Sequence, residues 1–201
     1  MRIPRIYLGQ TLRPGSGMVL DAQAHRHVTQ VLRLRAGAVL HVFNGDGHDY
    51  LARITQCARR ETYVELEARL PGLPESPLEL VLGMGIAKGE RMDFVLQKAT
   101  ELGITRIQPL WTKRSVPQTQ EERRERRQAH WRGVIAAACE QCGRACLPDL
   151  AMPLPVEEWL NADGLGREAA LGIVFDPGGT HRLDELTPPK GTCVLAIGPE
   201  G

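Results

Sequence analysis

The chain has 201 residues, 42% hydrophobic and 24% charged, a composition that is ordinary for a soluble globular protein. It contains no apolar run near the roughly 20 residues of a membrane span, and its first ten residues lack the apolar stretch of a secretory signal. Five cysteines, an odd number, argue against a disulfide scaffold, so we expect a cytoplasmic protein.

The net charge of +1 is unevenly distributed. Residues 1–70 contain ten Lys/Arg and six Asp/Glu, a net charge of +4, whereas residues 71–201 contain fifteen and eighteen, a net charge of −3. A basic first part favours contact with a polyanion. The alternative is an uneven surface charge without functional meaning.

The first part of the chain predicts a small β-barrel with one helix. Apolar residues spaced for one face predict a helix over residues 23–34. Strands are predicted over residues 39–43, 50–57 and 62–70. The sequence Asn-Gly-Asp-Gly at residues 44–47 is a strong turn signal between the first two strands.

The segment over residues 70–77 is the best candidate for a linker, because it holds three prolines and a glycine between two periodic regions. We therefore expect a β-barrel RNA-binding domain over residues 1–71 and a second domain over residues 75–201.

The second part alternates strands with helices, which predicts a mostly parallel, doubly wound α/β sheet. The predicted strands are residues 78–85, 105–111, 169–175 and 192–197, and the predicted helices are residues 90–103 and 121–143. The apolar face of the first helix is formed by Met92, Val95, Leu96, Ala99 and Leu102.

The segments that follow the four strands are the natural place for a ligand, since such sheets bind ligands at the carboxyl ends of their strands. These segments are residues 83–89, 111–115, 176–179 and 198–201. Three of them are rich in glycine, which lets backbone approach a ligand closely, and two carry cations. We expect all four at one edge of the sheet.

Two more specific motifs are incomplete. Residues 83–89 come close to G-x-G-x-x-G, but the last spacing is one residue too long, which disfavours a nicotinamide cofactor over a tight turn. Cys139, Cys142 and Cys146 resemble metal spacing, yet no second C-x-x-C follows, and the first two continue the apolar stripe of a helix. Buried packing is therefore favoured over a zinc site.

The segment over residues 25–37 gathers arginines and histidines, which fit either an RNA-binding face or the wet side of an amphipathic helix. Lys98 with Glu101, and Glu140 with Arg144, are spaced to form ion pairs on helices.

Together these segments resemble the RsmE family of ribosomal RNA methyltransferases, in the knotted SPOUT superfamily. The matching stretches are RIPRIYL, HVTQVLRLRAG, FNGDG, AKGERMDFVLQKATELGITRIQPLWTKRSV, WRGVIAAACEQCGRACLP and IGPEG. The resemblance implies an N-terminal barrel related to PUA or OB folds, a SPOUT-type catalytic domain and S-adenosylmethionine as the methyl donor. It implies methylation of a uridine N3 in 16S ribosomal RNA of the small subunit, by a homodimer that needs no metal.

The resemblance also assigns roles to residues. The catalytic cleft would be lined or braced by Lys98, Glu101, Arg114, Glu140, Gln141 and Arg144. The cofactor would be held by Phe175, Asp176, Ile197, Gly198, Pro199, Glu200 and Gly201. RNA would be bound by Arg2, Arg5, His27, Arg33 and Arg35.

Members of this family continue past IGPEG through another helix and a loop resembling LGxRILRxETA, which complete the knot. The resemblance therefore implies a sequence cut short before the knot, with cofactor binding that is weak or absent. Two rival functions stay open: a non-catalytic RNA-binding or assembly factor, and a small-molecule transferase or oxidoreductase.

Overall fold

The computed structural model describes residues 3–115, 121–162, 171–187 and 189–199. The chain divides into two units, the first formed by Met1–Glu75 with Ala136–Leu147 and the second by Ser76–Ile135 with Pro148–Gly201. The first unit therefore takes in a segment from late in the chain, which the linear division at residues 71–75 had given to the second domain. Within the described residues, no helix has the length and apolar character to cross a membrane.

The first unit contains a five-stranded mixed sheet. Its strands are β1 (Arg5–Tyr7), β2 (Gly17–Val19), β3 (Val39–Phe43), β4 (His48–Cys57) and β5 (Thr62–Pro71). They are ordered β1-β3-β4-β5-β2, with β1 parallel to β3 and the other pairs antiparallel. The three predicted strands are confirmed, whereas β1 and β2, of three residues each, are too short to show a pattern in the sequence.

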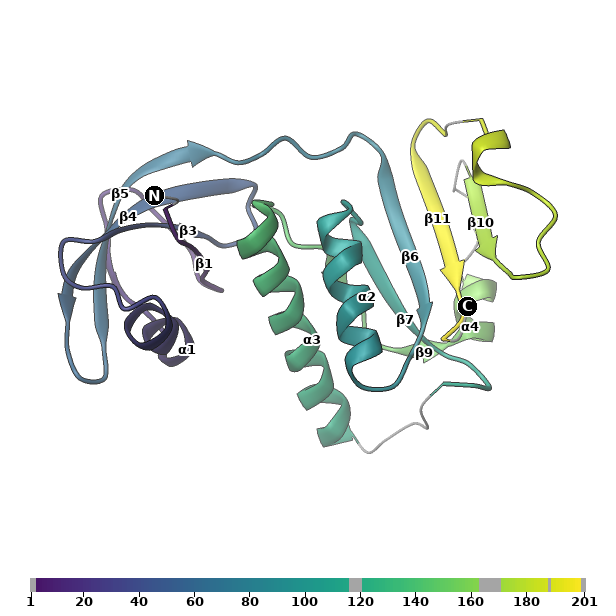
Figure 1. Cartoon of the computed structure of the whole chain (residues 1–201), viewed down its shortest axis with the longest axis horizontal. Coiled ribbons are helices and arrows are strands. Elements are labelled where there is room, and N and C mark those ends of the chain that lie inside the picture. The colour runs from purple at the N-terminus through teal and green to yellow at the C-terminus, as the bar shows by residue number, and fades with distance from the viewer. Residues whose placement is uncertain (1–2, 116–120, 163–170, 188, 200–201) are drawn as a thin grey trace. The chain divides into compact units, whose positions relative to one another are not determined.

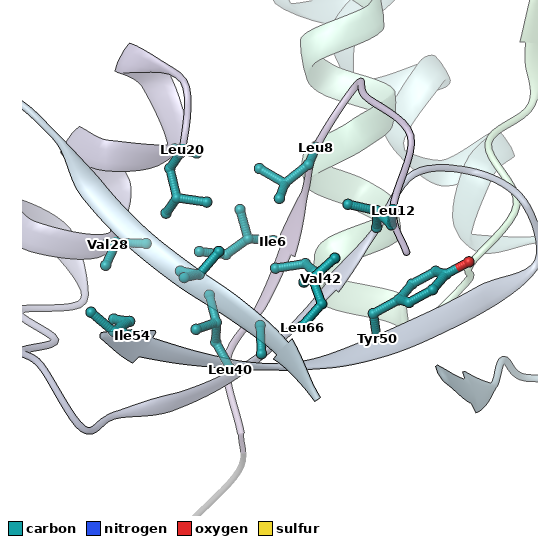
Figure 2. Close-up of a cluster of buried hydrophobic side chains, with 13 residues drawn as sticks. Ile6, Leu8, Leu12, Leu20, Val28, Leu40, Val42, Tyr50, Ile54 and Leu66 are labelled. Carbon is teal, nitrogen blue, oxygen red and sulfur yellow. The ribbon is translucent and has the colours of Figure 1, made fainter. Parts of the chain in front are cut away.

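The core of this unit lies on one side of the bent sheet. Figure 2 shows aliphatic side chains from β1, β3, β4 and β5 converging there, among them Ile6, Leu40 and Leu66, all nearly or completely buried. The β4–β5 ladder changes register between Leu51 and Ala52 and again between Ile54 and Gln56. Bulges of this kind bend a strand pair, which helps the sheet to wrap around its core.

The predicted helix over residues 23–34 is in fact two short elements, α1 (Ala22–Arg26) and the π-helical turn η1 (His27–Val31). Asp21 caps α1, because its carboxylate accepts hydrogen bonds from the backbone N–H groups of Gln23 and Ala24 in the first turn. The wider π turn changes the direction of the side chains. Val28 and Val31 belong to the apolar residues whose spacing predicted one helical face, yet Val28 is buried and Val31 is 69% exposed.

The second unit contains a six-stranded parallel sheet, which confirms the predicted α/β class. Its strands are β6 (Glu79–Gly85), β7 (Arg106–Trp111), β8 (Asp149–Leu150), β9 (Leu154–Pro155), β10 (Leu171–Phe175) and β11 (Thr192–Ile197). The order is β10-β11-β6-β7-β8, and β9 pairs with β7 further along the same strand.

The helices of this unit are α2 (Glu90–Glu101), α4 (Val156–Ala162), the short 3-10 turn η2 (Leu183–Glu185) and the first part of α3 (Glu121–Cys142). In α2, the predicted apolar face is confirmed at Met92, Leu96 and Ala99, which are buried. The prediction is wrong for Leu102, which follows the helix as its C-cap and is 79% exposed. Gly103, the next residue, has φ +92°, the left-handed conformation that commonly ends a helix.

One face of the parallel sheet is covered by α4. Trp159 packs there with Leu110 of β7 and Val194 of β11. A Cβ atom on Gly83 would lie 2.1 Å from the Trp159 ring. Gly83, which we had interpreted as making room for a ligand, instead makes room for this tryptophan.

Candidate active site

The carboxyl ends of four strands meet at one edge of the second unit, as predicted. Phe175 of β10 is paired with Ile197 of β11, and Ile197 is paired with Met84 of β6. Gly85 of β6 is paired with Leu110 of β7. All these pairs are parallel, and the arrowheads of β6, β10 and β11 point the same way in Figure 1. The segments after the four strands therefore leave the sheet on one side.

The described part of the loop after β11 crosses the end of β6 closely. A Cβ atom on Gly85 would lie 2.5 Å from Pro199 Cδ and 2.8 Å from Pro199 N. Gly85 is thus needed for the approach of protein rather than of ligand, a second correction to our interpretation of this glycine-rich turn.

Two hollows flank this loop. The first, which we name the α2 hollow, has a volume of about 380 Å³ and is lined mainly by apolar atoms. Its wall is formed by Met84, Ala87, Glu90, Arg91, Phe94, Val95, Ile197, Gly198 and Pro199. Phe94 is 61% exposed there, although it lies in the middle of α2. An apolar wall beside free backbone suits the adenosyl part of a ligand.

The second, which we name the β7 hollow, has a volume of about 340 Å³. It is lined by Thr112, Lys113, Arg114, Val156, Glu157, Gly198 and Pro199. The turn after β7 is fixed because Ser115 Oγ donates to Leu110 O at 3.1 Å and accepts from the Thr112 backbone N–H at 3.1 Å. This turn presents two cations opposite the loop of β11.

A third hollow, of about 490 Å³, lies between the start of α2 and α3. There His130 Nε2 lies 2.8 Å from Asp93 Oδ2, which joins the two helices. The guanidinium of Arg127 stands over the rings of Trp111 and Trp131, at 5.8 and 5.9 Å from their centroids.

The predicted cofactor residues fall at this edge as far as they are described. Phe175 and Ile197 end neighbouring strands, and Asp176 Oδ1 accepts a 2.7 Å hydrogen bond from the Gly178 N–H. Glu200 and Gly201 lie outside the described residues. Their role in holding a cofactor stays a prediction.

The predicted catalytic residues of the second unit do not all lie at this edge. Arg114 lies at the edge, in the β7 hollow. Lys98 and Glu101 form the predicted ion pair, with Nζ 2.7 Å from Oε2, but near the far end of α2. About 1.5 Å of rise per residue places Lys98 about 12 Å along the helix from its start at Glu90. Neither residue lines the three hollows described above.

Glu140, Gln141 and Arg144 belong to the first unit. The predicted Glu140–Arg144 pair is replaced by other contacts. Glu140 Oε1 accepts a 2.8 Å hydrogen bond from the Tyr7 N–H, and the guanidinium of Arg144 binds Glu75, with Nη2 2.8 Å from Oε2. Gln141 is exposed. A catalytic role for these three residues stays a prediction.

Burial raises the pKa of the Glu140 carboxyl above its ordinary value, against the Tyr7 N–H and the charges of His27 and Arg5, which lower it. A raised pKa in the folded protein means that the folded state holds this proton more tightly than the unfolded chain does. The stability associated with this proton is present at acid pH and is lost as the pH rises through the pKa of the folded state.

The substitution E140Q is therefore expected to match or exceed the wild type in free energy of unfolding at pH 8, because it removes a buried charge and keeps an acceptor for the Tyr7 N–H. The advantage should shrink towards pH 4. E140A should lose about 1–3 kcal/mol, because the N–H is left without a partner. Urea unfolding followed by circular dichroism at both pH values measures this. Equal losses for the two variants at pH 8 would contradict it.

Arg5 is held by internal contacts of the first unit, and its predicted RNA contact stays a prediction. The Arg5 side chain is only 7% exposed and forms a bidentate ion pair with Asp49, with Nη2 2.7 Å from Oδ1 and Nε 3.1 Å from Oδ2. It also donates to Cys139 O at 2.6 Å and stands 4.4 Å from the centroid of the Phe43 ring. Arg5 of β1 thus connects this strand to Asp49 of β4 and to the backbone of Cys139 within the first unit.

Of the other predicted RNA-binding residues, Arg33 and Arg35 are exposed and His27 is partly exposed, beside Glu140. Arg33 has φ +54°, an uncommon left-handed conformation for a residue with a side chain. Arg2 lies outside the described residues. An RNA contact for these residues stays a prediction.

Cys139 of α3 is a packing residue, whereas Cys142 is half-buried. Cys139 is completely buried, and burial raises the pKa of its thiol to about 12, which suppresses the thiolate that metals bind. No group of three or more His, Cys, Asp or Glu side chains among the described residues is arranged to hold a metal ion.

The substitution G85A tests the close approach of the β11 loop. It should cost about 1–3 kcal/mol of unfolding free energy, because Pro199 must move to admit the methyl group. The matched control is G133A on α3, where an added Cβ atom meets nothing within 4 Å. That change should instead stabilise by about 0.5–1 kcal/mol, since alanine favours a helix interior. Urea unfolding of both variants measures these free energies. An unchanged unfolding free energy for G85A would contradict the close contact between Gly85 and Pro199.

Sequence reasoning missed α4 and with it Glu157 and Trp159. The signal was present, because Val156, Trp159 and Leu160 are spaced for one helical face and Glu157 and Glu158 fill a first turn. Seven residues are too few for that periodicity to stand out.

Comparison with known proteins places this geometry among RNA-modifying enzymes. The RNA methyltransferase domain matches residues 74–201, and the RNA methyltransferase PUA domain matches residues 20–67. The ribosomal RNA small subunit methyltransferase E of Buchnera aphidicola subsp. Schizaphis graminum is 32% identical over 202 residues, which cover 100% of this chain and 80% of the relative.

Two solved structures share the fold over nearly the whole chain. A ribosomal RNA small subunit methyltransferase E from Neisseria gonorrhoeae bound to S-adenosyl methionine has a TM-score of 0.91 at 32% identity, over 100% of this chain and 81% of that chain. A methyltransferase of Legionella pneumophila in complex with the same cofactor has a TM-score of 0.88 at 29% identity, over 98% and 89% of the two chains.

Proposed function

The chain belongs to the ribosomal RNA small subunit methyltransferase E family, and from this premise we propose that it methylates a uridine of 16S ribosomal RNA at N3, with S-adenosylmethionine as the methyl donor. The observation that carries the proposal is the 32% identity and TM-score of 0.91 with a family member bound to that cofactor. The edge formed by β6, β7, β10 and β11 supports it, because the predicted cofactor loop and Arg114 both lie there.

The residues at this edge fit the cofactor. The apolar α2 hollow suits the adenosyl group, and Gly198 offers backbone without a side chain beside it. We propose that Phe175, Asp176, Ile197, Gly198 and Pro199, with Glu200 and Gly201, hold the cofactor. When bound, S-adenosylmethionine supplies an electrophilic methyl group.

The protein has to make uridine N3 a nucleophile. N3 carries a proton, and removing it leaves negative charge on the two neighbouring oxygens of the base. The Arg114 guanidinium, at the mouth of the β7 hollow, would stabilise this charge with its planar set of donors. Holding the base in line with the methyl group contributes the rest.

The RNA would be held by the basic first part of the chain, with Arg33 and Arg35 exposed for phosphate contact. We further propose a cytoplasmic homodimer. The homodimer and the location both follow from the family resemblance.

The decisive experiment transfers labelled methyl groups from S-adenosylmethionine to small ribosomal subunits that lack the modification. The proposal predicts one labelled uridine, methylated at N3, in 16S ribosomal RNA. Tight binding of the subunits without label would favour a non-catalytic assembly factor instead. Label recovered only in small molecules would favour a small-molecule transferase.

A further inference from the structure

The β7 hollow contains a carboxylate that the proposed mechanism has not yet used. Glu157 lines this hollow together with Arg114 and Pro199. We propose that Glu157 is the general base that takes the N3 proton from the target uridine. This inference rests on the proposed function and adds to it the group that starts the reaction.

The fold brings Glu157 to this place through a short β-bridge. Strand β9 runs parallel to β7, and Trp111 is paired with Pro155. Two parallel strands that are in register carry the residues that follow them to the same edge of the sheet. Glu157 comes two residues after Pro155, just as Lys113 comes two residues after Trp111. The start of α4 is therefore delivered beside the cationic turn that carries Arg114.

The orientation of α4 is fixed by its buried tryptophan. Trp159 is 7% exposed and packs against the sheet at Gly83. Since Glu157 lies two residues before Trp159, about 200° away around the helix axis, its side chain is directed away from the sheet. Glu157 is exposed, and it lines the hollow, so a substrate could reach it.

The other carboxylates proposed for catalysis, or near this edge, are occupied or lie outside the β7 hollow; Glu90, for example, lines the α2 hollow instead. Glu101 is bound to Lys98 on α2, and Glu140 accepts the Tyr7 N–H in the first unit. Asp176 accepts the Gly178 N–H, and Asp93 is bound to His130. Among the described residues that line the β7 hollow, Glu157 is the one carboxylate.

The step balances without any further reagent. The N3–H bond of uridine breaks, and its proton passes to a carboxylate oxygen of Glu157. The nitrogen electron pair then forms the bond to the methyl carbon, while the bond between that carbon and the sulfonium sulfur breaks. The products are N3-methyluridine, S-adenosylhomocysteine and a protonated Glu157, which returns its proton to water.

The chain offers a matched control for this proposal, because Glu158 is also exposed in the first turn of α4 but does not line the hollow. The experiment measures single-turnover methyl transfer to unmodified small subunits for the wild type, E157Q and E158Q, between pH 6 and 9. RNA affinity, cofactor affinity and urea unfolding are measured alongside.

We expect E157Q to lose about 100- to 10,000-fold in rate at pH 7, the range typical of a missing general base. Its rate should then rise about tenfold per pH unit, because the reaction depends on uridine that has ionised in water. E158Q should stay within about twofold of the wild type, and the two affinities and the stability should be unchanged in both variants.

Equal rates for E157Q and E158Q would overturn the proposal, as would an E157Q deficit that is the same at every pH. If the wild type itself labels no uridine, the proposed function fails. The two failures are therefore distinguishable in one assay.

Discussion

Replacing Arg114 by alanine should lower the rate of methyl transfer by about 100- to 1,000-fold, the effect typical of losing one group that stabilises charge in the transition state. The affinity for RNA should change little. The reason is geometric: Arg114 lines a hollow at the carboxyl ends of the strands, where charge develops on the base, whereas the exposed arginines proposed to hold RNA lie in the first unit.

The measurement compares single-turnover rate and RNA affinity for the wild type and R114A. The control is R126A, which removes an equal charge from an exposed position on α3. A fall in RNA affinity as large as the fall in rate would move Arg114 from the chemical step to binding.

Replacing Arg5 by alanine should destabilise the first unit by about 3–5 kcal/mol, because the Asp49 carboxylate, whose side chain is only 14% exposed, loses its bidentate guanidinium partner and keeps His41 Nδ1 at 3.8 Å. The carbonyl of Cys139 loses a donor at the same time. The loss is large because the charge cannot be solvated by water in compensation.

Arg53 provides the comparison, since it also binds a carboxylate, Glu67 on the neighbouring strand, but with 45% and 31% of the two side chains exposed. R53A should cost only about 0–1 kcal/mol. The double variant R5A/D49A should recover part of the loss, because it removes the stranded charge. Urea unfolding of the wild type, R5A, R53A and R5A/D49A measures these free energies. Equal losses for R5A and R53A would contradict the role given to Arg5.

The elements that sequence predicts well are those with long, regular patterns. Strand β11 is observed at the predicted residues, and α2 begins at its predicted start. Both bury one coherent set of side chains, so local pattern and tertiary packing agree. The common edge of the four strands followed from their parallel order, which the alternation of strands and helices already implied.

The features that sequence did not predict depend on partners far away in the chain. Arginine commonly binds phosphate, but the Arg5 side chain binds Asp49 and the Cys139 carbonyl instead. These partners lie 44 and 134 residues away in the chain. Gly83 and Gly85 have the pattern of a ligand loop, but their space is taken by Trp159 and Pro199. No local pattern carries that information. Where a glycine or an arginine serves packing, only the fold shows it.

The same limit applies to the chemistry. The family resemblance indicated Arg114 as a catalytic residue but indicated no general base. Helix α4, which brings Glu157 to the β7 hollow, is too short to be recognised from its periodicity. The pairing of β9 with β7 brings Glu157 beside Arg114. A strand of two residues is too short to produce a recognisable pattern in the sequence.

The central claim is that the cofactor binds where β6, β7, β10 and β11 end. Backbone amide chemical-shift mapping with S-adenosylhomocysteine tests it directly. The account predicts that the largest shifts fall on the backbone amides of residues 84–95, 112–115, 175, 176, 178, 179, 197 and 198. Shifts confined to the first unit would contradict it.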